Sequence, residues 1–217
     1  MMRTEEAREQ MIEQQVRAWD VLDERVLAIL RLVPREQFVS PQYRFLAFAD
    51  VEIPLPHAQH MLKPSVAGRL LQALDLSGSE RVLEVGTGSG FVTACLAAAS
   101  RTVHSVEIFT DIAEAARANL AGLGVANAQI VNDDAREVSA DGGYEAIALT
   151  ASLPVYDPRW ERQLALGGRL FVIVGEPPIM EARLVRRLSA ESWTSVSLFE
   201  TIVDPLCNSP RREEFSF

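Results

Sequence analysis

The sequence has little positive charge and no long apolar segment. Its 217 residues include 21 Lys and Arg against 30 Asp and Glu, a formal net charge of -9. Such a chain has no broad positive field to attract a phosphate backbone, so a nucleic-acid partner is not expected. No uncharged apolar run reaches about 18 residues, the length that spans a bilayer, so membrane insertion is not expected either.

Cysteine and histidine are also scarce. Cys95 and Cys207 are too few for a disulfide framework, and their spacing does not fit a thiolate metal site. His57 and His60 have no cysteine or acidic cluster nearby with ligand spacing, so no metal is expected. The charged stretch from Arg3 to Glu9 stands where a secretory signal has its apolar core. We therefore expect a cytoplasmic protein.

The composition is that of a folded protein, with 48% hydrophobic and 24% charged residues. Five prolines between residues 34 and 64 break regular elements there. We predict a helical and loop extension over residues 1–64 and an α/β domain over 65–217, packed as a single compact unit. Trp19, Phe45 and Phe48 are expected to pack against the core.

After Pro64, short apolar runs alternate with amphipathic stretches, which is typical of a parallel sheet covered by helices. The fold class predicted is α/β, with a doubly wound, mostly parallel sheet and an antiparallel edge hairpin. Segment 181–188 of that hairpin is also compatible with a helix. The predicted helices are 3–18, 23–32 with Asp23 as its N-cap, 90–99 and 110–121, and the predicted strands are 81–85, 102–107, 128–131, 144–149, 169–174 and the pair 181–188 and 193–202.

The most informative segment, Val82 to Gly90, reads VLEVGTGSG, an apolar strand followed by three glycines. Glycine permits positive φ and lets a ligand approach the backbone. The spacing is G-x-G-x-G and Phe91 follows, so the G-x-G-x-x-G dinucleotide fingerprint is broken. Glu84 stands two residues before Gly86, where a carboxylate would repel a pyrophosphate and attract a cationic or amine-bearing ligand.

Two acidic residues follow later strands. Glu107 ends the second predicted strand, where a carboxylate can accept hydrogen bonds from both hydroxyls of a ribose, although nicotinamide enzymes use this feature too. Asp134 follows the third strand and is compatible with a contact to the exocyclic amine of an adenine, or with a loop or helix-cap role. The set favours an adenosyl ligand without phosphate.

The sequence resembles the class I S-adenosylmethionine methyltransferases and, within them, the protein-L-isoaspartate O-methyltransferase family. The Glu-x-Gly-x-Gly-x-Gly block names only the superfamily, whereas VPREQFV at residues 33–39 is much more specific. The resemblance covers nearly the whole chain and also includes Ala49-Asp50, Gln59 with Pro64, Ser105–Glu107, Ala113–Leu120, Thr150-Ala151, Gly167–Leu170 and Val174-Gly175.

The resemblance implies a Rossmann-like fold, S-adenosylmethionine as cofactor, and methylation of the free α-carboxylate of L-isoaspartyl residues in damaged proteins. It implies Gln59 and His60 as substrate-binding residues, and we expect a monomer. The cofactor-binding residues that it implies are Glu84, Gly86, Thr87, Gly88, Ser89, Gly90, Glu107, Ile108 and Asp134.

One loop departs from the family pattern. The family reads Gly-x-Gly-Gln-Thr-Ile-Ser-x-Pro, whereas residues 56–64, here called the substrate loop, read PHAQHMLKP. His60 replaces the threonine, and Leu62 replaces the serine regarded as catalytically important. His60, as a hydrogen-bond donor or a base, and Leu62, as the divergent serine position, are therefore the candidate catalytic residues.

Three hypotheses follow. A carboxyl group with a pKa near 3.9 is ionised at pH 7 and needs no base, so loss of the serine removes one orienting hydrogen bond, worth about 0.5 to 1.5 kcal/mol. The leading hypothesis is thus an isoaspartyl carboxyl methyltransferase. The others are a methyltransferase of the same fold with another substrate, and a non-catalytic cofactor-binding protein.

Overall fold

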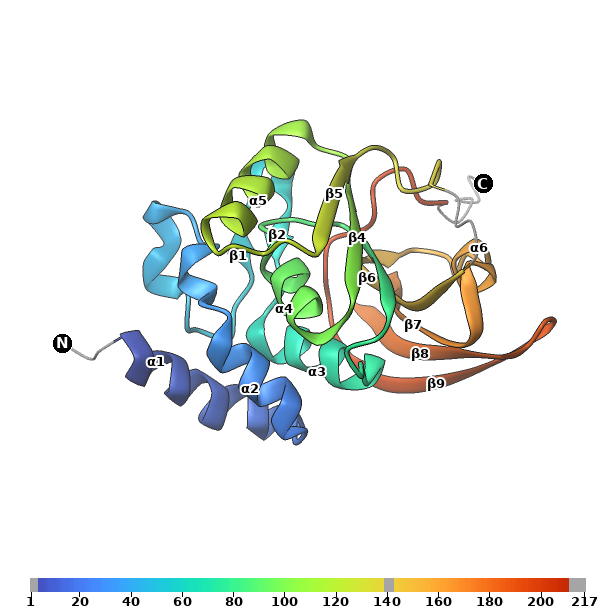
Figure 1. The fold of residues 1–217 in the computed structure, drawn as a ribbon, viewed down its shortest axis with the longest axis horizontal. Coiled ribbons are helices and arrows are strands. Elements are labelled where there is room, and N and C mark those ends of the chain that lie inside the picture. Colours follow the sequence, from blue (N-terminus) through green and yellow to red (C-terminus); the bar gives the residue numbers. More distant parts are fainter. Residues whose placement is uncertain (1–3, 139–142, 211–217) are drawn as a thin grey trace.

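The computed structural model of the protein describes residues 4–138 and 143–210. Its main sheet has seven strands in the spatial order β5-β4-β3-β6-β7-β8-β9 (Figure 1). Their bounds are β3 (Arg81–Val85), β4 (Thr102–Glu107), β5 (Ala128–Asn132), β6 (Tyr144–Leu153), β7 (Leu164–Glu176), β8 (Ile179–Ser189) and β9 (Ser192–Glu200).

The sheet is doubly wound. Strands β5 to β7 in this order pair in parallel, whereas β8 and β9 are antiparallel. The chain runs outward from β3 through β4 to β5 and then returns to place β6 on the other side of β3. In such sheets ligands bind at the carboxyl ends of the strands, where the strand order reverses. The predicted fold class is confirmed, and the ambiguous segment 181–188 is strand.

Six α-helices are present in the described part of the chain. Asp23 caps α2 as predicted, because its side chain accepts a hydrogen bond of 2.8 Å from the Arg25 amide. The predicted helix 3–18 is realised as α1 followed by a π turn (Ile12–Val16) and a 3-10 turn (Arg17–Trp19). The helices are α1 (Thr4–Met11), α2 (Glu24–Leu32), α3 (Pro64–Leu74), α4 (Phe91–Ala99), α5 (Thr110–Gly122) and α6 (Arg159–Arg162).

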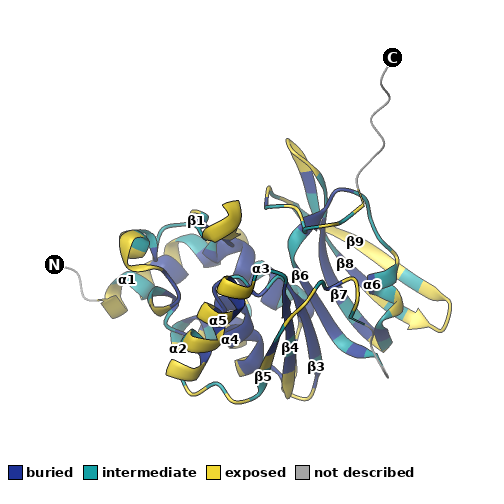
Figure 2. Ribbon diagram, turned by 90° about the horizontal axis from the view of Figure 1, so that it is seen from above, coloured by how far each residue is buried: buried dark blue, intermediate teal, exposed yellow. Residues whose placement is uncertain are grey.

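Two hydrophobic clusters cover the two faces of the sheet. Successive residues of a strand point to opposite faces, so Val82 joins one cluster and Leu83 the other. The first cluster packs the sheet against α2 to α5, and the second packs it against Trp160 of α6. Figure 2 shows the central strands β3, β4, β6 and β7 as a mainly buried layer, whereas β9 at the edge is mostly exposed. No helix in the described residues is long and apolar enough to cross a membrane.

The N-terminal extension shares the first cluster with the sheet. Ile12 and Phe171, for example, are both fully buried in it. The expectation for Phe45 was wrong, because its side chain is 80% exposed, and Trp19, at 42% exposed, only rests edge-on against Phe199. Phe48 does pack against the cluster. The domain boundary at residue 64 stays a prediction.

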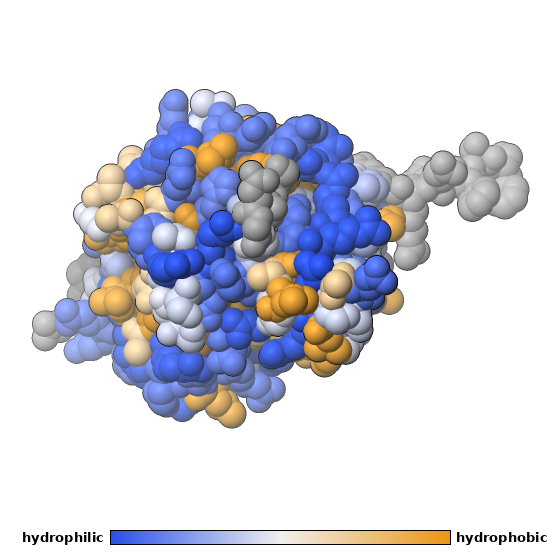
Figure 3. Space-filling view, turned by 45° about the vertical axis from the view of Figure 1, so that its right-hand side comes forward, coloured by the Kyte–Doolittle hydropathy of each residue, from blue (hydrophilic) through white to orange (hydrophobic). Residues whose placement is uncertain are grey.

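A two-stranded hairpin positions the substrate loop. Strand β1 (Ile53–Pro54) pairs antiparallel with β2 (His60–Met61), and a 3-10 turn (Pro56–Ala58) connects them. Within this turn His57 and Ala58 have positive φ values of 58° and 54°. The surface seen in Figure 3 is mainly hydrophilic, with apolar residues in small separate groups.

Candidate active site

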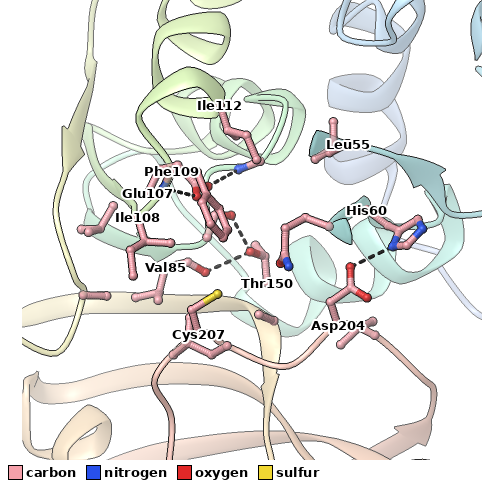
Figure 4. A pocket seen from close by; sticks show the side chains of 18 of the residues that line it. Leu55, His60, Val85, Glu107, Ile108, Phe109, Ile112, Thr150, Asp204 and Cys207 are labelled. Carbon is pink, nitrogen blue, oxygen red and sulfur yellow. Dashed lines mark hydrogen bonds and ion pairs between the residues drawn. The ribbon is translucent and has the colours of Figure 1, made fainter. Parts of the chain in front are cut away.

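An open cavity lies at the carboxyl ends of β3, β4 and β6, where the strand order reverses. In Figure 4, Glu107 and Phe109 stand at one end and His60 and Asp204 at the other. Of the predicted site residues, the cavity is lined by Gln59, His60, Leu62, Gly86, Gly88, Glu107, Ile108 and Asp134. Residues far apart in sequence thus meet where this fold places a ligand.

The glycine turn forms the floor between β3 and α4. Gly86 has a φ of 90°, and a Cβ built on it would stand 2.6 Å from Thr150 Oγ1, so only glycine fits. Gly88 has a φ of 54° and directs its amide to Glu107. Thr87 and Ser89 line a smaller adjoining cavity, and Gly90 packs against Ala116 of α5.

Glu107 is buried and fixed by the backbone. Its Oε2 accepts a hydrogen bond of 2.9 Å from the Gly88 amide, and its Oε1 accepts one of 3.1 Å from the Phe109 amide. Each carboxylate oxygen keeps a further lone pair for a ligand. This arrangement suits a pair of neighbouring hydroxyl donors, such as those of a ribose.

Glu84 lies behind the glycine turn and lines neither cavity. Its Oε2 accepts hydrogen bonds from the hydroxyls of Thr93 (2.5 Å) and Ser105 (2.6 Å), while Oε1 is buried without a partner among the described residues. Burial raises the pKa of Glu84 to about 8. At neutral pH its carboxyl group is therefore mainly uncharged, and its direct contact with a cofactor stays a prediction.

Asp134 reaches the cavity with its carboxylate already engaged. Arg136 and Asn208 both donate hydrogen bonds to its Oδ2, at 2.8 and 2.9 Å. The hydrogen bond from Arg136 is the main cause that lowers the pKa of Asp134 to about 2. Asp133, which the sequence analysis did not select, lines the same part of the cavity. The contact of Asp134 with an adenine amine stays a prediction.

The substrate loop forms the opposite wall. His60 Nδ1 and Asp204 Oδ2 are 2.9 Å apart, and both side chains are only partly exposed. Leu62 is 7% exposed and packs into the first cluster, so its side chain is an apolar wall. His57 stacks on Phe109 with ring centroids 4.2 Å apart and bonds Asp111 at 2.9 Å. The loop therefore contacts the segment that follows β4.

Several lining residues were not selected from the sequence. Thr150 Oγ1 lies 2.9 Å from the Val85 carbonyl oxygen and ties β6 to the end of β3. In the sequence, Thr150 was marked only by the Thr150-Ala151 pair, which matches the family pattern. Val203, Asp204 and Cys207 come from the segment after β9, which returns to the cavity and pairs with β6 at Ser152. No local pattern marks these three, because only the fold brings them to the site.

Comparisons with known proteins agree on one family. The family model for protein-L-isoaspartate(D-aspartate) O-methyltransferase matches residues 6–206. A protein-L-isoaspartate O-methyltransferase of Koribacter versatilis is 36% identical over 181 residues, 83% of this chain and 82% of that protein. Protein-L-isoaspartate O-methyltransferase 1 of Rhodopseudomonas palustris is 40% identical over 180 residues, covering 82% of this chain and 73% of that protein.

A solved structure shares the fold. It is a candidate protein-L-isoaspartate O-methyltransferase of Plasmodium falciparum in complex with S-adenosyl-L-homocysteine. The two chains superpose with a TM-score of 0.78 at 20% identity, covering 92% of this chain and 97% of the other. At this identity the likeness describes the fold alone.

Proposed function

This chain belongs to the protein-L-isoaspartate(D-aspartate) O-methyltransferase family, and we propose that it transfers a methyl group from S-adenosylmethionine to the free α-carboxylate of L-isoaspartyl residues. The observation that carries this proposal is the cavity at the carboxyl ends of β3 and β4. Its floor is the glycine turn, its polar anchor is Glu107, and its opposite wall is the substrate loop.

The cavity offers hydrogen-bond acceptors and apolar contacts that suit the cofactor. Glu107 retains lone pairs for two ribose hydroxyls, and Val106, Ile108 and Leu206 offer apolar contacts for an adenine ring. At Gly88 a side chain would stand against Leu55 in the space that the ligand needs. The bound cofactor supplies an electrophilic methyl group on a sulfonium sulfur.

The chain's own residues position the acceptor and exclude water. The isoaspartyl carboxylate is already ionised at neutral pH, so alignment and desolvation are the tasks left to the protein. Leu55, Leu62 and Val203 line the cavity with apolar side chains that favour desolvation. Gln59, which also lines it, supplies a polar group for the peptide.

With Nδ1–H directed to Asp204, His60 has a second N–H for a carboxylate only when its imidazole is protonated. A neutral imidazole that donates Nδ1–H to Asp204 has a lone pair on Nε2, which a carboxylate avoids. A protonated imidazole donates from both nitrogens, one to Asp204 and one to the acceptor carboxylate. In either form, the Nδ1–H group of His60 lies 2.9 Å from the Asp204 oxygen that accepts its hydrogen bond.

The same pair favours a second candidate function. With Nδ1–H held by Asp204, the Nε2 lone pair of His60 is a general base, which a carboxylate acceptor does not require. A methyl acceptor that carries a proton, such as a hydroxyl group, does require one. This candidate is methyl transfer by the same fold to such an acceptor, and the third alternative is cofactor binding without turnover.

Methyl transfer from a radiolabelled cofactor to an isoaspartyl peptide and to its normal aspartyl twin tests the proposal. We expect a base-labile product on the isoaspartyl peptide alone. His60→Gln, which keeps a polar side chain but cannot become a cation, should lower this activity about 10-fold. Lys63→Gln is the matched control, because it removes a neighbouring charge outside the cavity lining. No label on either peptide, with cofactor bound, would favour the alternatives.

We also propose that the chain acts as a cytoplasmic monomer on isoaspartyl-containing proteins, without a nucleic-acid or membrane partner. The net charge of -9 and the free thiols of Cys95 and Cys207 support this assignment. Residues 1–64 are proposed as the extension that carries the substrate loop, and 65–217 as the cofactor-binding domain. Sedimentation velocity tests the monomer, and a first proteolytic cut near residue 64 would support the division.

A further inference from the structure

A second, smaller cavity adjoins the active-site cavity at the substrate loop. The two cavities share His60, Leu62, Gly86, Gly88 and Thr150. The remaining lining of the smaller cavity is Arg35, Met61, Thr87, Ser89, Phe91 and Val92. Because α4 begins at Phe91, this cavity lies at the amino end of a nine-residue helix. Free backbone amides and the helix dipole favour an anion at that place.

Arg35 brings a buried positive charge to this cavity. Its side chain is 1% exposed and lies over the Phe91 ring, with Cζ 4.8 Å from the ring centroid. Nε donates to the Ala47 carbonyl at 3.1 Å, and Nη2 donates to the Leu62 carbonyl at 2.8 Å. The third nitrogen, Nη1, is buried and has no hydrogen-bond partner among the described residues.

No acidic side chain in the described part of the chain forms an ion pair with Arg35. Burial lowers the pKa of Arg35 to about 10, so the guanidinium is still charged at neutral pH. A buried cation without a counterion is unfavourable unless another group offsets the lost hydration. Asp50 lies near enough to stabilise this charge electrostatically without forming an ion pair, so what Arg35 still lacks is a hydrogen-bond acceptor for Nη1 among the described residues.

Acidic side chains are concentrated in the larger cavity. Glu52, Glu107, Asp133, Asp134 and Asp204 all line the larger cavity. A ligand with both an ammonium and a carboxylate group would be oriented by this division of charge. Its ammonium would face the acidic side chains, and its carboxylate would face Arg35 and the amino end of α4.

We propose that Arg35 and the amino end of α4 form a carboxylate-binding subsite, in which Nη1 donates to a carboxylate oxygen of the bound ligand. This inference rests on the proposed function, because both reactants of that function carry a carboxylate. One is the amino-acid end of the cofactor, and the other is the α-carboxylate of the isoaspartyl residue. The recognition chemistry is the same for both sources.

Two ligands that differ by the carboxylate test the subsite. S-adenosylhomocysteine carries the amino-acid end, and 5′-methylthioadenosine has the same adenosine thioether without it. By calorimetry, Arg35→Met should weaken S-adenosylhomocysteine about 10-fold to 100-fold and change 5′-methylthioadenosine by no more than about 2-fold. Arg35→Lys should lie between wild type and Arg35→Met. Arg101→Met, at an exposed arginine outside both cavities, makes the same change in net charge and should have no effect.

Measuring the KM for an isoaspartyl peptide shows whether the carboxylate bound by Arg35 belongs to the cofactor or to the acceptor. If S-adenosylhomocysteine keeps its affinity for Arg35→Met while the KM for an isoaspartyl peptide rises at least about 10-fold at saturating cofactor, the subsite holds the acceptor. If selective weakening of S-adenosylhomocysteine is observed, the subsite holds the cofactor. Either result supports the proposal.

Equal weakening of both ligands, or no change in either ligand and in KM, would overturn the subsite and leave Arg35 a structural residue. Retained 5′-methylthioadenosine binding shows that the adenosine pocket is folded, and Arg35→Lys decides the question if Arg35→Met does not fold. The binding arm needs no methyl transfer. A wild type that does not methylate isoaspartyl peptides but discriminates the two ligands through Arg35 would refute the proposed function alone.

Discussion

The two walls of the active-site cavity are assembled in different ways. The wall made by β3, β4 and the glycine turn uses backbone amides and a buried carboxylate within one segment, from Val82 to Phe109. The wall made by the substrate loop uses side chains, and its central contact joins His60 to Asp204 across 144 positions of sequence. The first wall depends on backbone geometry, whereas the second depends on which side chains meet.

This difference separates two properties of the enzyme. The glycine turn tolerates few substitutions, because its φ values and close contacts exclude side chains. The substrate loop, in contrast, departs from the family pattern at His60 and Leu62 while it keeps the β1–β2 hairpin. Changes in the substrate loop can therefore alter which acceptor is methylated while the wall made by β3, β4 and the glycine turn stays the same. Variants of that wall should change cofactor affinity, and variants of the loop should change activity on the acceptor.

The largest effect is expected from Gly88→Val. The branched side chain would occupy the space next to Leu55, and a φ of 54° is strained for valine. Affinity for S-adenosylhomocysteine should fall at least about 1000-fold, the equivalent of about 4 kcal/mol. Gly78→Val is the matched control, because Gly78 also has a positive φ but nothing lies near its Cβ position. If calorimetry gave equal affinities for the two variants, the glycine turn would not be the cofactor floor.

Glu84, which lies behind the glycine turn, should make the stability of the protein depend on pH. Its pKa of about 8 in the folded protein exceeds the value of 4.5 for an exposed glutamate, so the folded state binds more protons between these values. Stability should therefore fall as pH rises from 5 to 8, by up to about 1.4 kcal/mol per pH unit and about 2 to 4 kcal/mol in total. Glu84→Gln should remove this slope.

Urea unfolding of wild type and Glu84→Gln at pH 5, 6, 7 and 8 measures the difference. Glu52→Gln is the control in the other wall, where burial also raises the pKa of Glu52 but the side chain is not fully buried. Its effect on the slope should be smaller. Parallel stability curves for wild type and Glu84→Gln would mean that Glu84 is ionised in the folded protein.

Glu107→Gln should weaken the cofactor by about 10-fold to 100-fold, or about 1.4 to 2.7 kcal/mol. The amide loses the charge that two hydroxyl donors would use, and its NH₂ group would face the amide of Gly88 or Phe109. Glu52→Gln makes the same chemical change at the loop wall, where no ribose contact is proposed, and should weaken S-adenosylhomocysteine less than Glu107→Gln does. Calorimetry that finds equal losses would remove the distinction between the walls.

The features predicted correctly from the sequence are those that depend on residues within one short segment. The apolar runs of β3 and β6, the glycine spacing and the Asp23 cap each lie within one short segment, and each was predicted. The β8–β9 hairpin was predicted from alternation in 193–202, although its first strand was also compatible with a helix. The exposure of Phe45 was not predicted, because the sequence around an aromatic residue among prolines does not indicate whether its side chain points to the core or to solvent.

The same distinction applies to the residues of the candidate site. Gly86, Gly88 and Glu107 were identified because a motif places them in register. Asp204 was missed because its partner His60 lies in another part of the chain. The buried state of Glu84 was missed as well, since its hydroxyl partners Thr93 and Ser105 meet it only after α4 and β4 pack together.

Leu62→Ser should have the smallest effect and the clearest meaning. If Leu62 merely lacks the orienting hydrogen bond of the family serine, the serine variant should raise kcat/KM for an isoaspartyl peptide about 3-fold to 10-fold, or about 0.7 to 1.4 kcal/mol. Because Leu62 is 7% exposed, the substitution should also cost about 2 to 4 kcal/mol of stability. Leu62→Ala controls for this cost, since it loses the same packing without gaining a hydroxyl. Affinity for S-adenosylhomocysteine should be equal in both variants if the walls are independent. A serine variant no more active than the alanine variant, with both below wild type, would show that the apolar side chain itself shapes the acceptor site.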